Sequence, residues 1–228
     1  MFINSIVLNA LGIFLSLFIL ETVLSADNAV ALAALVQHLP NEQQQKQVLN
    51  WGLGGAFILR ILLILAATWV AQFWQFQLVG SIYLLWLTGK YFSLRLETEK
   101  ELEKSIFIEH ENKTMYWQMV PMIAMTDLAF SLDSVTSAVA LSDQTWLILG
   151  GGLMGVIALR FLAELFIQWL NQFTYLQDAA YLTIFWVGIR LLVKALLPNF
   201  ILPEWLIITG VILLFTWGFS KRESVEIS

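Results

Sequence analysis

Residues 18–33 read FILETVLSADNAVALA and place two carboxylates and one amide inside a long apolar run. The polar side chains are those of Glu21, Asp27 and Asn28. An ionised side chain at the centre of a bilayer costs roughly 2.5–3.5 kcal/mol on insertion scales, and such residues usually carry a function. The rest of the sequence must therefore supply counter-charges or a ligand for these groups.

The composition around this stretch is that of a membrane protein. The chain has 228 residues and is 59% hydrophobic, whereas soluble domains are about 45–50% apolar. It has no cysteine, which excludes disulfides and zinc–thiolate sites, and its formal charge of −5 argues against a nucleic-acid partner. Residues 1–10 contain no Lys or Arg, which argues against a cleavable signal peptide.

Seven apolar segments are long enough to cross a bilayer, which takes about 20 residues. We predict spans at about 6–36, 48–72, 77–96, 115–140, 145–170, 178–197 and 203–220. The acidic connection at 97–113 is predicted to be a solvated loop or short surface helix, with partner binding as the alternative. The expected fold is a single all-α transmembrane domain over residues 1–228.

The acidic motif occurs twice. The polar residues of 123–138, IAMTDLAFSLDSVTSA, match those of 18–33 at an offset of 106. This alignment pairs Glu21 with Asp127, Ser25 with Ser131, Asp27 with Asp133 and Asn28 with Ser134. GAFILR at 55–60 likewise matches GVIALR at 155–160. Three spans per copy would insert the second copy upside down, as in many secondary transporters. We predict inverted repeats over about 6–96 and 115–197, plus a seventh helix at 203–220.

The distribution of Lys and Arg predicts the orientation. Connections on one predicted side carry eight of them, whereas the other side has only Arg190 and Lys194. Because cytoplasmic loops are enriched in basic residues, we expect the N-terminus outside and the C-terminus in the cytoplasm.

The geometry of the first motif predicts a break in its helix. At about 100° per residue, Asp27 points roughly 120° away from Glu21. A single helix over 6–36 would be about 46 Å long, against a hydrocarbon core of about 30 Å. Ser, Asp and Asn favour turns. We therefore expect an unwound stretch near 24–28 that turns both acids inward, and a second copy loosened by Pro121.

The four acids of the two motifs, with nearby amide, hydroxyl and carbonyl oxygens, suit a hard cation such as manganese, calcium or magnesium. Four carboxylates exceed the charge of one divalent ion, which implies a bound proton or a nearby arginine. The alternative is that the acids form buried ion pairs with Arg60 and Arg160. Arg60 could neutralise a site acid or anchor a helix, whereas Arg160 and Glu164, at i and i+4, are predicted to form a structural pair. Glycines that open the second and fifth spans predict close helix packing, with a hinge as the alternative.

ETVLSADN, residues 21–28, resembles the E-x-x-L-S-x-D-N signature of the TerC family of integral membrane proteins, and DLAFSLDSV, residues 127–135, resembles its second acidic motif. The resemblance covers about residues 10–220. It implies seven spans, an external N-terminus, kinship with the LysE transporter superfamily and manganese export. The metal-site residues implied are Glu21, Asp27, Asn28, Asp127 and Asp133. To these we add Ser134, which stands where a repeated Asn is expected, and Ser25, Ser131, Arg60 and Arg160 as supporting hydroxyls and charge partners.

The expected function is therefore a secondary transporter, in a bacterial inner membrane, that exports a divalent cation, most simply manganese, by alternating access, with exchange for protons as one form of coupling. Its expected partners are the metal ion and the lipid bilayer, without a resident cofactor. A calcium- or sodium-specific transporter is a variant. A membrane-protein insertion or assembly factor that acts through residues 97–113 is a separate alternative. An aspartyl protease built on Asp27 and Asp133 is disfavoured, because its Tyr-Asp and Gly-x-Gly-Asp motifs do not occur.

Overall fold

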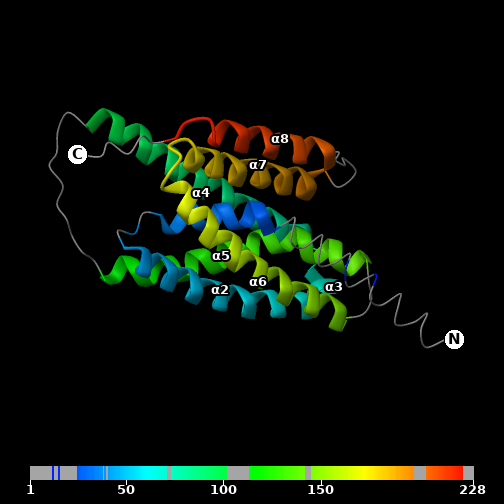
Figure 1. Ribbon diagram of the computed structural model, residues 1–228. Coiled ribbons are helices and arrows are strands. Elements are labelled where there is room, and N and C mark those ends of the chain that lie inside the picture. The colour runs from blue at the N-terminus through cyan, green and yellow to red at the C-terminus, as the bar shows by residue number, and fades with distance from the viewer. Residues whose placement is uncertain are drawn as a thin grey trace, which may run out of the picture.

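The computed structural model describes residues 12, 15, 25–37, 39, 41–70, 73–101, 113–141, 145–197 and 204–222, in places by their backbone alone. The regular structure of this part of the chain is helical, apart from one isolated bridge between Phe173 and Arg222. Figure 1 shows the helices packed side by side as a bundle. They are Ser25–Val36, α2 (Glu42–Leu65), α3 (Ala67–Val70), α4 (Trp74–Glu101), α5 (Lys113–Leu141), α6 (Thr145–Leu170), α7 (Leu176–Leu196) and α8 (Glu204–Gly218).

The six later predicted spans agree with these helices apart from local differences at their ends, whereas most of the first, 6–36, lies outside the described residues before Ser25. The largest difference is at α2, which begins at Glu42 because the Asn41 side chain caps it, accepting a hydrogen bond from the Gln43 backbone N–H at 2.9 Å. The predicted span 48–72 is divided between α2 and the short α3. Helix α4 continues to Glu101, into the region predicted to be a loop.

The Ser25–Val36 helix lies at the centre of the bundle (Figure 1). Its residues 29–36 are eight consecutive hydrophobic positions, each no more than 4% exposed. A helix that is apolar on every side must be surrounded by other elements. The sequence of this segment therefore places it in the core, with α2, α4, α5, α6 and α7 supplying further buried side chains.

Two helix pairs form the framework around this centre, α2 with α5 and α4 with α7, while α8 packs against α7 (Figure 1). The α2–α5 contact is close because Gly52 has no side chain. A Cβ atom at that position would lie 2.5 Å from the Ile123 Cγ2 atom of α5. The packing role predicted for the glycines is thus confirmed at Gly52, whereas a Cβ at Gly54 would meet nothing within 4 Å.

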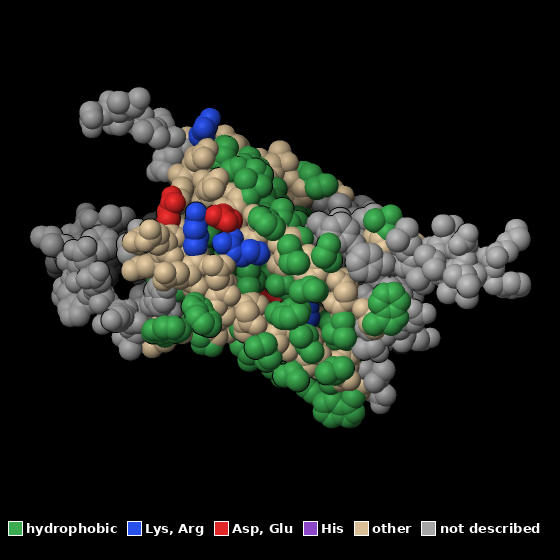
Figure 2. All heavy atoms as spheres, turned by 60° about the horizontal axis from the view of Figure 1, so that its bottom comes forward, with side chains coloured by type: hydrophobic (Ala, Val, Ile, Leu, Met, Phe, Trp, Pro, Cys, Tyr) green, Lys and Arg blue, Asp and Glu red, His purple; other side chains and the backbone are tan. Residues whose placement is uncertain are grey.

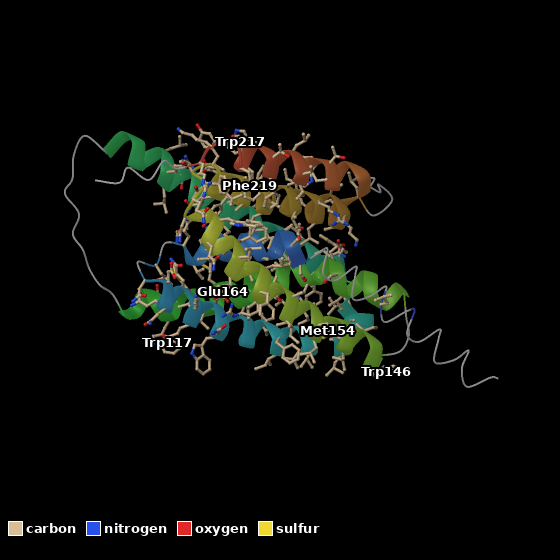
Figure 3. All side chains as sticks on the ribbon, in the orientation of Figure 1. Trp117, Trp146, Met154, Glu164, Trp217 and Phe219 are labelled. Carbon is tan, nitrogen blue, oxygen red and sulfur yellow. The ribbon has the colours of Figure 1, made fainter. Side chains whose placement is uncertain are left out.

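The outer surface of the bundle is apolar. Within the described residues, three helices are long and apolar enough to cross a membrane: Glu42–Leu65, Ile148–Leu170 and Leu176–Leu196. Large side chains such as Trp51 and Phe161 are 64% and 70% exposed, and Figure 2 shows hydrophobic side chains spread over one face. Exposed Trp117 and Trp146 lie at opposite ends of the bundle (Figure 3), as expected of residues at the two membrane interfaces.

The predicted break in the first helix is wrong for the part that the structure describes. Residues 25–28 are α-helical and continue without interruption to Val36. No unwinding is needed there, because the helix is enclosed by protein and its polar side chains do not have to be turned away from lipid. Helix α5 also continues through Pro121, which is exposed on its surface, so the predicted loosening of the second copy is absent.

Candidate functional site

Most of the predicted site residues lie in the interior of the bundle, on the central helix and on α5. Ser25, Asn28, Asp127, Ser131 and Ser134 are buried, whereas Asp27 and Asp133 are partly buried. Glu21, the remaining acid of the predicted set, lies outside the described residues.

Asp127 of α5 pairs with Arg60 of α2. The Arg60 Nη2 atom lies 3.2 Å from both carboxylate oxygens, and the Ser131 hydroxyl donates to Oδ2 at 3.3 Å. Arg60 is 2% exposed and Asp127 is 0% exposed. Loss of one member of a buried pair leaves the other charge uncompensated, which costs about 3–5 kcal/mol. Arg60 therefore does both of the things considered for it: it neutralises a motif acid and fastens α2 to α5.

Asp133, two turns further along α5, is held by two basic residues of α7. Arg190 Nη2 lies 3.0 Å from Oδ2, and Lys194 Nζ lies 2.5 Å from Oδ1. Arg190 and Lys194 are four residues apart, so both project from one face of α7. Each oxygen of the Asp133 carboxylate consequently has its own cation.

Asp27 of the central helix lies near the same group. Arg190 and Asp133 are close enough to act electrostatically on its carboxylate. The Asn28 backbone N–H donates to Asp27 Oδ1 at 2.9 Å, which holds the carboxylate against its own helix. Arg190 thus binds Asp133 directly and acts electrostatically on Asp27, the acid that corresponds to Asp133 in the first motif.

The oxygen atoms near this place fit a hard cation, which prefers carboxylate, amide and hydroxyl ligands. The Ser25 hydroxyl is fully buried and has no hydrogen-bond partner among the described residues, which leaves it able to bind a ligand. Ser134, by contrast, already donates to the Ser131 carbonyl at 3.3 Å. No three acidic or histidine side chains within the described part of the chain converge on a metal position.

Arg160 is placed apart from these acids. It pairs with Glu164 at 2.8 Å, which confirms the predicted structural pair, and it donates to Asn50 of α2. Lys46 of α2 also binds Glu164, at 2.9 Å. Figure 3 labels Glu164 on α6 where it faces the start of α2, and Figure 2 shows a small cluster of acidic and basic side chains beside the apolar surface. This cluster joins α2 to α6 at the surface.

Arg190 and Lys194 are the functional residues missing from the predicted set. The sequence signal for both is their position, because they are the two basic residues on the side that the predicted topology leaves otherwise free of Lys and Arg. A basic pair that departs from the charge bias of a membrane protein needs a partner within the protein. Sequence alone did not identify Asp133 as that partner.

The comparison with known proteins agrees with the sequence motifs. The family described as "Integral membrane protein TerC family" matches residues 8–224. The uncharacterized membrane protein YceF of Bacillus subtilis is 35% identical over 182 residues, which cover 79% of this chain and 70% of that protein. The uncharacterized membrane protein YkoY of Bacillus subtilis is 33% identical, over 87% of this chain and 65% of its own length.

A more distant relative is the UPF0053 inner membrane protein YgdQ of Escherichia coli strain K12. It is 29% identical over 65% of this chain and 66% of its own length. The chain thus spans 65–70% of the length of these three relatives. No solved structure matches the chain.

Proposed function

Because the chain belongs to the TerC family of integral membrane proteins, we propose that it is a secondary transporter that exports a divalent metal cation. The proposed substrate is manganese, as the family resemblance implies, and the proposed mechanism is alternating access with exchange for protons. The observation that carries this proposal is that acids and hydroxyls of both motifs, among them Asp27, Asp127, Ser131 and Asp133, lie buried or partly buried within a membrane bundle.

The proposed substrate ligands are Glu21, Asp27, Asn28, Asp127, Asp133 and Ser134. Their carboxylate, amide and hydroxyl oxygens are hard donors, which suits manganese, calcium or magnesium better than copper. The buried, unpartnered Ser25 hydroxyl supports this assignment and adds a further oxygen donor on the same helix turn as Asp27 and Asn28.

The charges around the acids support a site that is loaded and emptied. Asp127 is neutralised by Arg60, and Asp133 by Arg190 and Lys194. A carboxylate that changes its partner from a basic side chain or a proton to a metal ion can alternate between loaded and empty states without leaving a buried charge uncompensated.

The architecture that we propose for this exchange is a pair of inverted repeats, one of them over about 6–96 and the other over 115–197, with α8 as an addition. The close packing of α4 against α7, the third helices of the two copies, is what a two-fold axis between the copies would produce. The N-terminus is proposed to lie outside and the C-terminus in the cytoplasm, as the basic residues of the connections predict. Alternating access would then be a movement of one repeat against the other around the acids.

The test is metal flux in proteoliposomes that contain the purified full chain and a metal-sensitive and a pH-sensitive dye inside. We expect manganese to cross against an imposed proton gradient, with proton movement in the opposite direction. Calcium, magnesium and sodium, offered separately, identify the substrate among hard cations. Flux equal to that of protein-free vesicles for every cation would refute transport and favour a role in membrane-protein assembly.

A further inference from the structure

Lys194 holds an unusual position for a lysine near the end of a membrane helix. It is two residues from the end of α7, whereas its partner Asp133 is eight residues from the end of α5. Lysines at helix ends usually extend toward the interface, where the ammonium is hydrated. The Lys194 ammonium instead binds Asp133, although 43% of its side chain remains exposed.

Among the acids and bases of the site that the structure describes, which do not include Glu21, the charges balance with Lys194 in this position. Asp127 and Arg60 balance one another, and the formal charges of Asp27 and Asp133 equal those of Arg190 and Lys194. A divalent cation that bound to Asp27 and Asp133 would add two positive charges beside two others. Repulsion would keep it out unless one of the resident cations moved away.

Of the two basic residues, Lys194 is the one suited to move. An arginine presents a planar fork to a carboxylate, whereas a lysine is a compact charge on a flexible four-carbon stem. Arg190 is also the more enclosed of the two, with 27% of its side chain exposed. Lys194 can therefore leave Asp133 by rotating its stem toward the end of α7, while Arg190 stays in place.

We propose that Lys194 is an internal substitute for the transported cation. It binds Asp133 when the site is empty and is displaced when the metal ion binds. The inference rests on the proposed transport function and deepens it. It names Lys194 as the residue that allows the metal-free protein to change back to the state that binds metal. Without Lys194, Asp133 would lose one of its two cations and keep only Arg190 during the return step, which weakens the compensation of its charge.

This role predicts different effects on two modes of transport. In metal-for-metal exchange, the protein changes between its outward-facing and inward-facing states with metal bound in both directions, so it does not need Lys194. In net transport, the protein must return without metal, and Asp133 then needs Lys194 even when the other acids carry the exchanged protons. For Lys194→Met we expect net manganese flux to fall about tenfold, within the range typical of coupling between two binding events, while exchange stays within about twofold. Manganese should also bind the purified variant more tightly, because its competitor is gone.

The matched control is Lys90→Met. Lys90 lies exposed on α4 with its ammonium over the Trp86 ring, 5.5 Å from the ring centroid, and contacts none of the acids discussed above. Both flux modes should be unchanged in this variant. Lys194→Arg keeps the charge. Its ratio of net flux to exchange flux should therefore lie closer to the ratio of the unmodified protein than the ratio of Lys194→Met does.

The absence of cysteine from the chain allows a chemical rescue. In Lys194→Cys, the introduced thiol can be converted to an aminoethyl thioether, which restores a positive charge at nearly the length of lysine. Net flux should return after this treatment and not after methylation with a neutral reagent. Manganese should accelerate modification of the aminoethylated amine by an amine-reactive reagent, because the metal displaces it from Asp133.

The outcomes separate the two proposals. If the unmodified protein moves no cation in either mode, the transport function itself is refuted. If it transports but Lys194→Met and Lys194→Cys change both modes equally or neither, transport stands and the role of Lys194 is overturned. A loss confined to net flux, with rescue by the aminoethyl group, establishes it.

Discussion

Arg60 and Asp127 form an ion pair in which the Arg60 Nη2 atom lies 3.2 Å from both carboxylate oxygens, and neither side chain is more than 2% exposed. The pair connects α2 to α5 at the level of the acidic motif. Because both charges are buried, the structure depends on each having the other. This relationship makes a direct prediction about stability.

Replacing Arg60 by Met should lower the free energy of unfolding by about 3–5 kcal/mol, because Asp127 is left buried without a counter-charge. Unfolding in detergent can be followed by the fluorescence of the ten tryptophans. The double variant Arg60→Met with Asp127→Asn should recover most of the loss. Arg160→Met is the control, since its partly exposed pair with Glu164 is worth about 0–1 kcal/mol. Equal losses from Arg60→Met and Arg160→Met would contradict the buried pair.

A second prediction concerns the close contact of α2 with α5. Gly52→Ala should destabilise the protein, because the added methyl group would lie 2.5 Å from Ile123 Cγ2. Overpacking of this kind typically costs about 1–3 kcal/mol. The paired variant Gly52→Ala with Ile123→Ala should be more stable than Gly52→Ala alone.

Gly54→Ala, two residues away on the same helix, is the control for this prediction. A Cβ there has open space around it, and alanine favours a helix over glycine by about 1 kcal/mol. It should therefore leave the midpoint of thermal unfolding unchanged or raise it. If Gly54→Ala lowered the midpoint of thermal unfolding as much as Gly52→Ala, the close contact of α2 with α5 would not explain the effect at Gly52.

A third prediction separates site carboxylates from surface ones. Asp133 and Glu164 each bind two basic side chains, but Asp133 lies among the motif acids and Glu164 lies at the α2–α6 surface. Asp133→Asn should reduce manganese flux at least about tenfold, which is the smallest loss commonly seen when even an outer partner of a metal site is removed. Glu164→Gln should leave flux near that of the unmodified protein. If both variants behaved alike in proteoliposomes, Asp133 would have no special part in transport.

A fourth prediction concerns the junction of α4 with α7. The Tyr91 hydroxyl donates to Asp178 Oδ1 at 2.7 Å, and Arg95 pairs with the same carboxylate in the first turn of α7. Tyr91→Phe should cost about 1 kcal/mol, the usual value of one hydrogen bond. Asp178→Ala should cost more, because Tyr91 and Arg95 lose their partner and the helix N-terminus loses a favourable charge.

Salt distinguishes the two contacts of Asp178. Arg95 is 40% exposed, so its ion pair should weaken when the ionic strength of the detergent solution is raised. The hydrogen bond from Tyr91, whose hydroxyl carries no net charge, should weaken much less. The stability difference between Tyr91→Phe and the unmodified protein should therefore be nearly the same at low and high salt, and a strong salt dependence would contradict this assignment.

Much of the helical architecture follows from local patterns in the sequence. The apolar runs located the helices, and unbroken hydrophobicity at residues 29–36 is enough to require burial on every side. Motif spacing also identified Asp127 and Asp133 before any packing was known. The cap at Asn41, which lengthens α2, was missed because the polar residues 41–47 read as a connection. The break expected at residues 24–28 is absent over residues 25–28, because local turn preference yields when the surrounding helices enclose the segment.

The sequence by itself determined that this chain belongs in a membrane, that it is helical, and that its acids come in two matching sets. Only the tertiary structure decided which base meets which acid. Arg60 and Arg160 occupy equivalent places in the matching segments GAFILR and GVIALR, yet the first binds buried Asp127 and the second binds Glu164 at the surface. Helical periodicity states which face a side chain occupies, but an ion pair depends on distances between helices. Those distances are set by packing contacts such as that of Gly52 with Ile123.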